Sequence, residues 1–97
     1  MKPVDILPGA RLDFDQSFDW YAERNVQAAE RFANAVDVTL AEIAEHPERH
    51  AKVDERHHQC AVPKFPFRIV YRHELRRIVV VAIAHAKRRP GYWESRA

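Results

Sequence analysis

The sequence has few of the residues on which several common functions depend. Its 97 residues include one cysteine, Cys60, so an internal disulfide is excluded and a reducing compartment is favoured. The two glycines, Gly9 and Gly91, cannot form a glycine-rich phosphate loop, which disfavours nucleotide binding. Nucleophilic catalysis is also disfavoured, because neither Cys60 nor the two serines stand in a recognisable catalytic context.

Long apolar runs are missing as well. The longest, residues 78–84, is far shorter than the ~18 residues that a membrane-spanning helix needs. The N-terminal stretch has an acidic residue inside its only apolar segment, which is not the pattern of a signal peptide. We therefore expect, by exclusion, a cytosolic chain with no membrane partner, folded as a single domain over residues 1–97.

Histidine is present, but not at a spacing typical of metal sites. A proline separates the first two members of the richest segment, so they cannot share a helical face, and the chain has no CxxC pair. We predict solvated loop histidines, no metal and no cofactor. The residues of this segment are His46, His50, His57, His58 and Cys60.

Charge is unevenly distributed, although the net charge is only +2. Residues 1–63 contain 7 Lys/Arg and 12 Asp/Glu, whereas residues 64–97 contain 9 and 2, which gives −5 and +7. A basic C-terminal third indicates an anionic partner, either nucleic acid or an acidic protein segment. The same pattern would arise if the acidic part neutralised the basic part across the fold, and charge alone leaves both interpretations open.

The N-terminal half predicts a short strand and two helices. Residues 2–7 are a candidate strand that ends at Pro8 and Gly9. Aromatic residues at helical spacing predict a helix from about residue 10 to 24, and Asn25 can end this helix or cap the next. Apolar residues recur every three or four positions over residues 26–45, a second helix that pairs with the first as a hairpin. The acidic residues assigned to the solvent face of the first helix are Asp13, Asp15, Asp19 and Glu23.

The C-terminal third predicts three strands. Residues 59–63 form a short candidate with a weak pattern, and residues 67–72 alternate between an apolar and a partly basic face. Residues 78–83 are almost wholly apolar, so we place this strand at the centre of the sheet, covered on both faces. The polar turn at 73–77 favours an antiparallel hairpin. The order β-αα-βββ is that of an α+β fold, with the helical hairpin packed on a small, mainly antiparallel sheet.

Basic and aromatic side chains near the last two strands form the strongest candidate site. Guanidinium groups bind phosphate bidentately and aromatic faces stack on bases. A metal-free ribonuclease could combine a cation for the developing phosphorane charge with a tyrosine or lysine for proton transfer. The candidate target-binding residues are Arg68, Arg72, Lys87, Arg88, Arg89, Tyr92 and Trp93.

A structural role is the alternative for the same residues. Arg68 would then pair with a carboxylate of the helical hairpin, and this is the interpretation that we favour for Arg68. Trp93 would pack against the core. For the run from Lys87 to Arg89, a binding patch and a merely solvated segment both stay open.

Three stretches of the chain form a recognisable combination. They read AAERFANAVDVTLAEIAEHP, FPFRIVYR and VVVAIAHAKRRPGYWESR. Within the last of them, His85, Arg88, Pro90, Tyr92 and Trp93 fit an H-x-x-R-x-P-x-Y-W pattern. Together these stretches resemble the RelE/ParE superfamily of toxins from bacterial type II toxin–antitoxin systems, and they look most like its ParE branch. The resemblance implies the same β-αα-βββ fold and a cognate protein antitoxin that wraps the toxin.

The resemblance also implies alternative targets. RelE-like members cleave mRNA on the ribosome, whereas ParE-like members act on DNA gyrase and are not nucleases. The nuclease branch has lysines on the strand before the central motif, and residues 58–62 have neither lysine nor arginine, which favours a gyrase inhibitor. If the chain is instead an endoribonuclease, the resemblance assigns catalysis to Arg68, Arg88 and Tyr92.

Two further expectations follow from the resemblance. The toxin–antitoxin complex would bind operator DNA through the antitoxin, and a toxin-fold protein that has lost toxicity remains a third possibility. If the basic tail carries toxicity, deleting residues 86–97 should abolish growth arrest and leave a folded protein.

Overall fold

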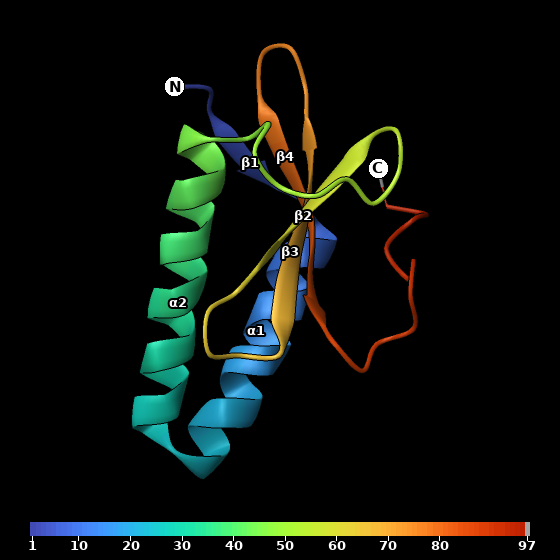
Figure 1. Cartoon of the computed structure of the whole chain (residues 1–97). Helices are drawn as coiled ribbons and strands as arrows, with labels where there is room; N and C mark the ends of the chain where they lie inside the picture. Colours follow the sequence, from blue (N-terminus) through green and yellow to red (C-terminus); the bar gives the residue numbers. More distant parts are fainter. Residues whose placement is uncertain (97) are drawn as a thin grey trace.

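The computed structural model describes residues 1–96, in which one strand is followed by two helices and three strands (Figure 1). The predicted β-αα-βββ order and the α+β class are confirmed. The elements are β1 (Val4–Ile6), α1 (Pro8–Arg24), α2 (Val26–Glu45), β2 (His57–Ala61), β3 (Phe67–His73) and β4 (Ile78–His85).

Helix α1 begins at Pro8, two residues earlier than the apolar pattern predicted. Proline suits the first helical position, because its missing N–H would have no partner there and its φ is already helical. The Leu7 N–H donates to the Val80 carbonyl at 3.0 Å, so the chain passes from β1 into α1 without a loop. Asn25 serves both helices, as expected: its N–H closes the last turn of α1 and its side chain caps the Ala28 N–H.

The sheet has the strand order β1-β4-β3-β2. β1 pairs with β4 in parallel, and the other two pairs are antiparallel. β4 therefore lies inside the sheet, and all of its residues except His85 are buried, as predicted for the central strand. β2 begins at His57 and ends at Ala61. Both ends lie two residues earlier in the chain than those of the predicted segment, 59–63.

The two faces of the sheet are covered by different layers (Figure 1). Both helices pack on one face, and residues 86–96, which we call the tail, cover the other. Most of the large buried side chains lie between the helices and the sheet. Because fully burying each of them contributes roughly 1.5–3 kcal/mol, this layer provides most of the hydrophobic stabilisation. Its largest contributors are Phe32, Ile43, Ile69, Tyr71 and Ile78.

β4 contains a bulge that shapes the tail face. Val70 of β3 pairs with Ala82 and Tyr71 pairs with Val80, which leaves Val81 without a direct partner. One extra residue interrupts the alternation of side chains, so Val81 and Ala82 both face the tail. The bulge thus widens the apolar surface on which the tail lies.

Candidate target-binding site at the C-terminal tail

The tail turns back over the sheet directly after β4. The Lys87 N–H donates to His85 Nδ1 at 2.9 Å, and Gly91 has a φ of 74°, which glycine adopts without strain. Trp93 is only 5% exposed and packs against the apolar patch of the tail face, with the His57 ring 4.7 Å away. The interpretation that Trp93 packs against the core is therefore confirmed.

Helix α1 contributes a buried carboxylate to which the tail is tied. Asp13 is 5% exposed and accepts hydrogen bonds from the Ile83 N–H at 3.1 Å and the Tyr92 hydroxyl at 2.9 Å. Two guanidinium nitrogens of Arg96 also donate to it, at 2.7 and 3.1 Å. The prediction that Asp13 lies on the solvent face is wrong, because it shares the inner face of α1 with the buried Ala10, one turn earlier.

The pair of Asp13 and Arg96 completes the hydrogen bonding of the sheet. β1 is shorter than β4, so the outer edge of β4 beyond the paired residues has no neighbouring strand. Asp13 accepts the N–H of Ile83, and Arg96 donates to the carbonyl of Val81 at 3.0 Å. Backbone groups that would otherwise lack partners are satisfied by two side chains. Arg96 runs close over Gly9, where a Cβ would lie 2.6 Å from its Nε.

The phenol of Tyr92 is held protonated by these contacts. Burial, the charge of Asp13 and the hydrogen bond to it raise the pKa of Tyr92 to about 12. The guanidinium carbon of Arg88 lies 3.8 Å from the centre of the Tyr92 ring, and that of Arg96 lies 5.0 Å from it. Both the hydroxyl and the ring of Tyr92 are thus engaged within the fold.

A pocket of about 170 Å³ lies between the tail and the adjacent parts of β2, β3 and β4, and we call it the tail pocket. Of the lining residues in the described chain, none is acidic. Its polar and charged residues are Gln59, Arg68, His85, Arg88, Arg89 and Tyr92, and its other side chains are Val53, Val70, Ala84, Ala86, Pro90 and Trp93.

The seven predicted site residues do not form one cluster. Five of them line the tail pocket, whereas Lys87 is exposed and lies outside it. Arg72 is buried toward the other end of β3, where its Nε donates to Glu74 Oε2 at 3.1 Å. The five that line the pocket are Arg68, Arg88, Arg89, Tyr92 and Trp93.

Arg68 does not pair with the helical hairpin. It is exposed, and its Nη1 donates to the amide oxygen of Gln59 at 3.4 Å. The prediction of a carboxylate partner on the helices is wrong, because alternation along β3 places Arg68 on the face opposite to Phe67 and Ile69, which pack under the helices. Its guanidinium group is left facing the tail side of the sheet.

The histidines of residues 46–58 are less solvated than predicted. Residues 51–53 fold back along β2, with the Gln59 N–H donating to the Ala51 carbonyl at 2.9 Å. His57 Nδ1 lies 2.9 Å from an Asp54 carboxylate oxygen. His58 Nδ1 donates to the His50 carbonyl at 3.0 Å, and its ring stacks on Tyr71. Over residues 1–96, no group of three or more His, Cys, Asp and Glu side chains is placed to hold a metal ion.

Sequence reasoning missed several residues of the site. His85 and Gln59 line the pocket, and His85 already stood in the family-like pattern. Asp13 had a local signal, since it falls three residues after Ala10 and four before Ser17 on one helical face. Arg96 had none, because its partner is 83 residues away.

The fold is that of a small α+β domain in which a helical hairpin covers one face of a four-stranded sheet and a basic pocket lies on the other. A solved structure described as the chromosomal ParDE TA system from P. aeruginosa matches with a TM-score of 0.70 and 14% identity, covering 88% of this chain and 96% of that chain. A family model described as "ParE toxin of type II toxin-antitoxin system, parDE" matches residues 4–90, and the chain belongs to that family. A search of curated protein sequences finds no significant match.

These comparisons confirm the resemblance inferred from the sequence. The family match ends at residue 90, so Tyr92, Trp93 and Arg96 lie beyond it. The family match therefore does not cover these three residues of the tail. In the part of the chain that the structure describes, neither helix is long and apolar enough to cross a membrane.

Proposed function

We propose that this ParE-family toxin inhibits DNA gyrase in the cytosol through its tail pocket, and that a cognate protein antitoxin neutralises it. The observation that carries the proposal is that both aromatic side chains of the tail are already engaged in contacts within the fold. Trp93 is buried, and Tyr92 gives its hydroxyl to Asp13 and its ring face to Arg88. The pocket therefore retains positive charge for binding an anionic surface, while its aromatics are occupied.

Nuclease chemistry finds little support in the same residues. A phenol with a pKa of about 12 provides almost no phenolate near neutral pH, so Tyr92 is a poor general base. β2, which borders the pocket through Gln59, has no lysine or arginine, whereas the resemblance places lysines on this strand in the nuclease branch. Charge stabilisation would then depend on the arginines of β3 and the tail, Arg68, Arg88 and Arg89.

An mRNA endoribonuclease remains the second candidate because of one residue. His85 lines the pocket beside Arg68 and Arg88, and an imidazole can move a proton near neutral pH. With two guanidinium groups for the phosphate, this set could support metal-free cleavage of RNA. We regard it as the alternative, since gyrase inhibition requires only binding.

The test is metabolic labelling after the chain is induced in bacteria without its antitoxin. We expect DNA synthesis to fall early while protein synthesis persists, and co-expressed antitoxin to restore growth. An early fall in protein synthesis would favour mRNA cleavage. No arrest would leave both targets without support and point to a non-toxic protein that only binds its antitoxin.

A matched pair of variants tests whether growth arrest depends on the tail pocket. Arg68→Gln removes a charge from the tail pocket, and Arg76→Gln removes the same charge from the exposed β3–β4 turn. Growth arrest should weaken only with Arg68→Gln. Binding of the toxin–antitoxin complex to operator DNA, which we attribute to the antitoxin, should be the same with both variants.

A further inference from the structure

We propose that the tail pocket binds a carboxylate side chain from an acidic segment of the target protein. This inference rests on the proposed function in one respect, namely that the target is a protein. It adds the chemical group that the pocket recognises. The support comes from the charge, size and walls of the pocket.

The pocket is lined by three arginines, and the carboxylate near it is that of Glu94, which lies against Gly91 at the pocket wall. Arg68, Arg88 and Arg89 form no ion pair with a carboxylate of residues 1–96. Elsewhere in the fold this chain does pair its arginines, as Arg72 with Glu74 and Arg77 with Asp5 show. Arginines that form no ion pair in a concave site are suited to an anion supplied by another molecule.

The size of the pocket limits the anion. Its volume of about 170 Å³ lies below the roughly 300–1,000 Å³ typical of pockets that bury small-molecule ligands. At roughly 30 Å³ per water molecule in the liquid, it corresponds to between five and six waters. A carboxylate on a short aliphatic stem fits this space, which is too small to enclose a whole nucleotide.

The walls of the pocket are partly apolar. Val53, Val70, Ala84 and Pro90 line it alongside the charged groups. Methylene groups of a glutamate or aspartate would lie against these side chains while the carboxylate meets the guanidinium groups. A phosphodiester would meet the same guanidinium groups, but the sugars that flank it are more polar than methylene groups and gain less from these apolar walls.

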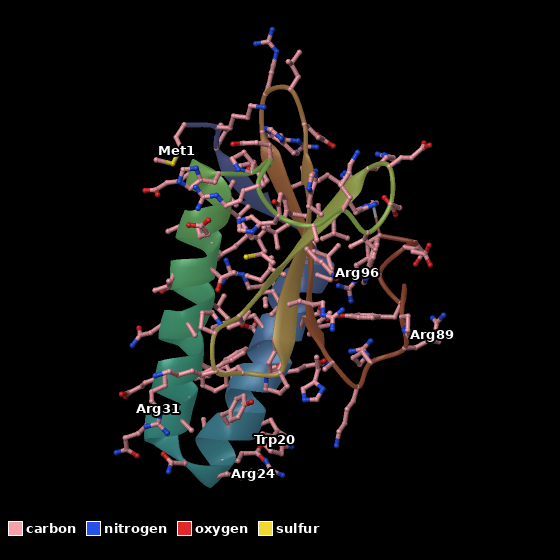
Figure 2. All side chains as sticks on the ribbon, viewed as in Figure 1. Met1, Trp20, Arg24, Arg31, Arg89 and Arg96 are labelled. Atoms are coloured by element: carbon pink, nitrogen blue, oxygen red, sulfur yellow. The ribbon has the colours of Figure 1, made fainter. Side chains whose placement is uncertain are left out.

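The aromatic residues of the site oppose binding of single-stranded nucleic acid. Single-stranded nucleic acids are commonly held by stacking bases on exposed aromatic rings. Trp93 is buried, and a base could stack on Tyr92 only by displacing the guanidinium group of Arg88. Figure 2 shows Arg89 reaching away from the fold at the outer side of the tail, where it could meet a second acidic residue of the same segment.

The direct test is binding of a hexaglutamate peptide to the full chain, followed by NMR of the arginine side-chain N–H signals. The expected result is a shift of the Arg68 and Arg88 signals and about tenfold weaker binding by Arg68→Gln, with partial recovery in Arg68→Lys. Arg76→Gln is the control and should bind as the unmodified chain does. Inorganic phosphate and a hexanucleotide RNA serve as the competing probes.

Two outcomes of the peptide test would overturn the proposal. One is tighter binding of the RNA than of hexaglutamate with the same dependence on Arg68, which would identify a nucleic-acid site. The other is hexaglutamate binding that Arg68→Gln leaves unchanged, which would show that the peptide binds elsewhere. Thermal unfolding of Arg68→Gln should match the unmodified chain, because Arg68 is exposed.

A parallel measurement with purified gyrase separates this proposal from the proposed function. Loss of gyrase binding in Arg68→Gln, with competition by hexaglutamate, supports both. Gyrase binding that is equal in Arg68→Gln and Arg76→Gln overturns the pocket proposal and leaves gyrase as the target. Absence of gyrase binding, with hexaglutamate still bound at Arg68, overturns the target and retains the carboxylate pocket.

Discussion

Asp13 is the residue at which helix, strand and tail meet. It accepts hydrogen bonds from the backbone of β4 and from two tail side chains, Tyr92 and Arg96. A buried carboxylate is costly unless it is paired, and removing one member of such a pair costs more than the intact pair contributes. Figure 2 shows Arg96 turned inward from the tail toward this point. The position of Tyr92, and through it that of Arg88, depends on this contact.

Asp13→Asn should therefore destabilise the fold. A neutral amide cannot balance the guanidinium group of Arg96, and one of its ends is a donor facing other donors. We expect the free energy of unfolding to fall by about 3 kcal/mol. This is the lower end of the cost of breaking a buried ion pair, and we choose it because Arg96 is partly exposed. Urea denaturation measures it, with the exposed Asp15→Asn as the control. Equal effects of the two substitutions would contradict the role of Asp13.

Gly9→Ala should destabilise the fold although it favours the helix. Alanine is better than glycine in a helix by about 1 kcal/mol, and Gly9 lies in the first turn of α1. The added Cβ would lie 2.6 Å from Nε and 2.8 Å from Cδ of Arg96, so this side chain must move and its bonds to Asp13 weaken. In an Arg96→Ala background, which removes the atoms that the Cβ would meet, the same substitution should become neutral or stabilising. Stabilisation in the unmodified chain would argue against the contact.

The three tyrosines should titrate above the ordinary pKa of tyrosine. Burial is the main cause that raises the pKa of Tyr21, Tyr71 and Tyr92, the last to about 12. Because the folded pKa of Tyr92 is above the unfolded value, its contribution to stability is complete below pH ~10 and is lost as the pH rises toward 12. Near-ultraviolet titration of tyrosinate, compared with Tyr92→Phe, measures this. Half-ionised tyrosine in the native chain at pH ~10 would contradict it.

Among the elements, those with a regular apolar period were predictable from the sequence. The apolar stripe over residues 26–45 predicted where α2 begins and ends. The almost wholly apolar sequence of β4 predicted that this strand lies inside the sheet. Both patterns are local in the sequence. The bulge at Val81 was not predictable, since it depends on how β3 and β4 pair. The site was predictable in part. Five of the proposed residues meet at one pocket, but the contacts that hold the tail join Asp13 to Tyr92 and Arg96, which are 79 and 83 positions away.

The tail is an element of the core, so its deletion is expected to unfold the chain. Losing residues 86–97 would expose the apolar patch under Trp93 and leave Asp13 without two of its donors. Truncating a buried tryptophan alone costs about 3–5 kcal/mol. This replaces the expectation from the sequence that the deleted chain stays folded. Circular dichroism of the deletion should show lost thermal stability.

A triple substitution tests the role of the tail in toxicity without unfolding it. Changing Lys87, Arg88 and Arg89 to glutamine removes three exposed charges and keeps Trp93 and Arg96 in place. We expect a folded protein whose induction no longer arrests growth. Full toxicity of the folded triple variant would show that these charges are not needed.

Across the whole molecule, the two signs of charge are segregated more than neutralised. Residues 1–63 and 64–97 carry −5 and +7, and within residues 1–96 two residue pairs, Arg77 with Asp5 and Arg96 with Asp13, form the ion pairs that join them. The helices that carry much of the acidic charge cover one face of the sheet, and the tail pocket lies on the other (Figure 1). An antitoxin that covers the basic face would meet little competing negative charge there.

The affinity for the antitoxin should therefore fall as salt is added. Exposed charge pairs are screened over the Debye length, which shrinks from about 8 Å at 0.15 M salt to about 3 Å at 1 M. Calorimetric titration of the purified toxin with its antitoxin at several salt concentrations measures the slope. If the antitoxin covers the tail pocket, Arg68→Gln should flatten that slope, and Arg76→Gln, in the distant turn, should change it less. Affinity that does not change with salt would mean that apolar contacts, and not the basic face, hold the complex together.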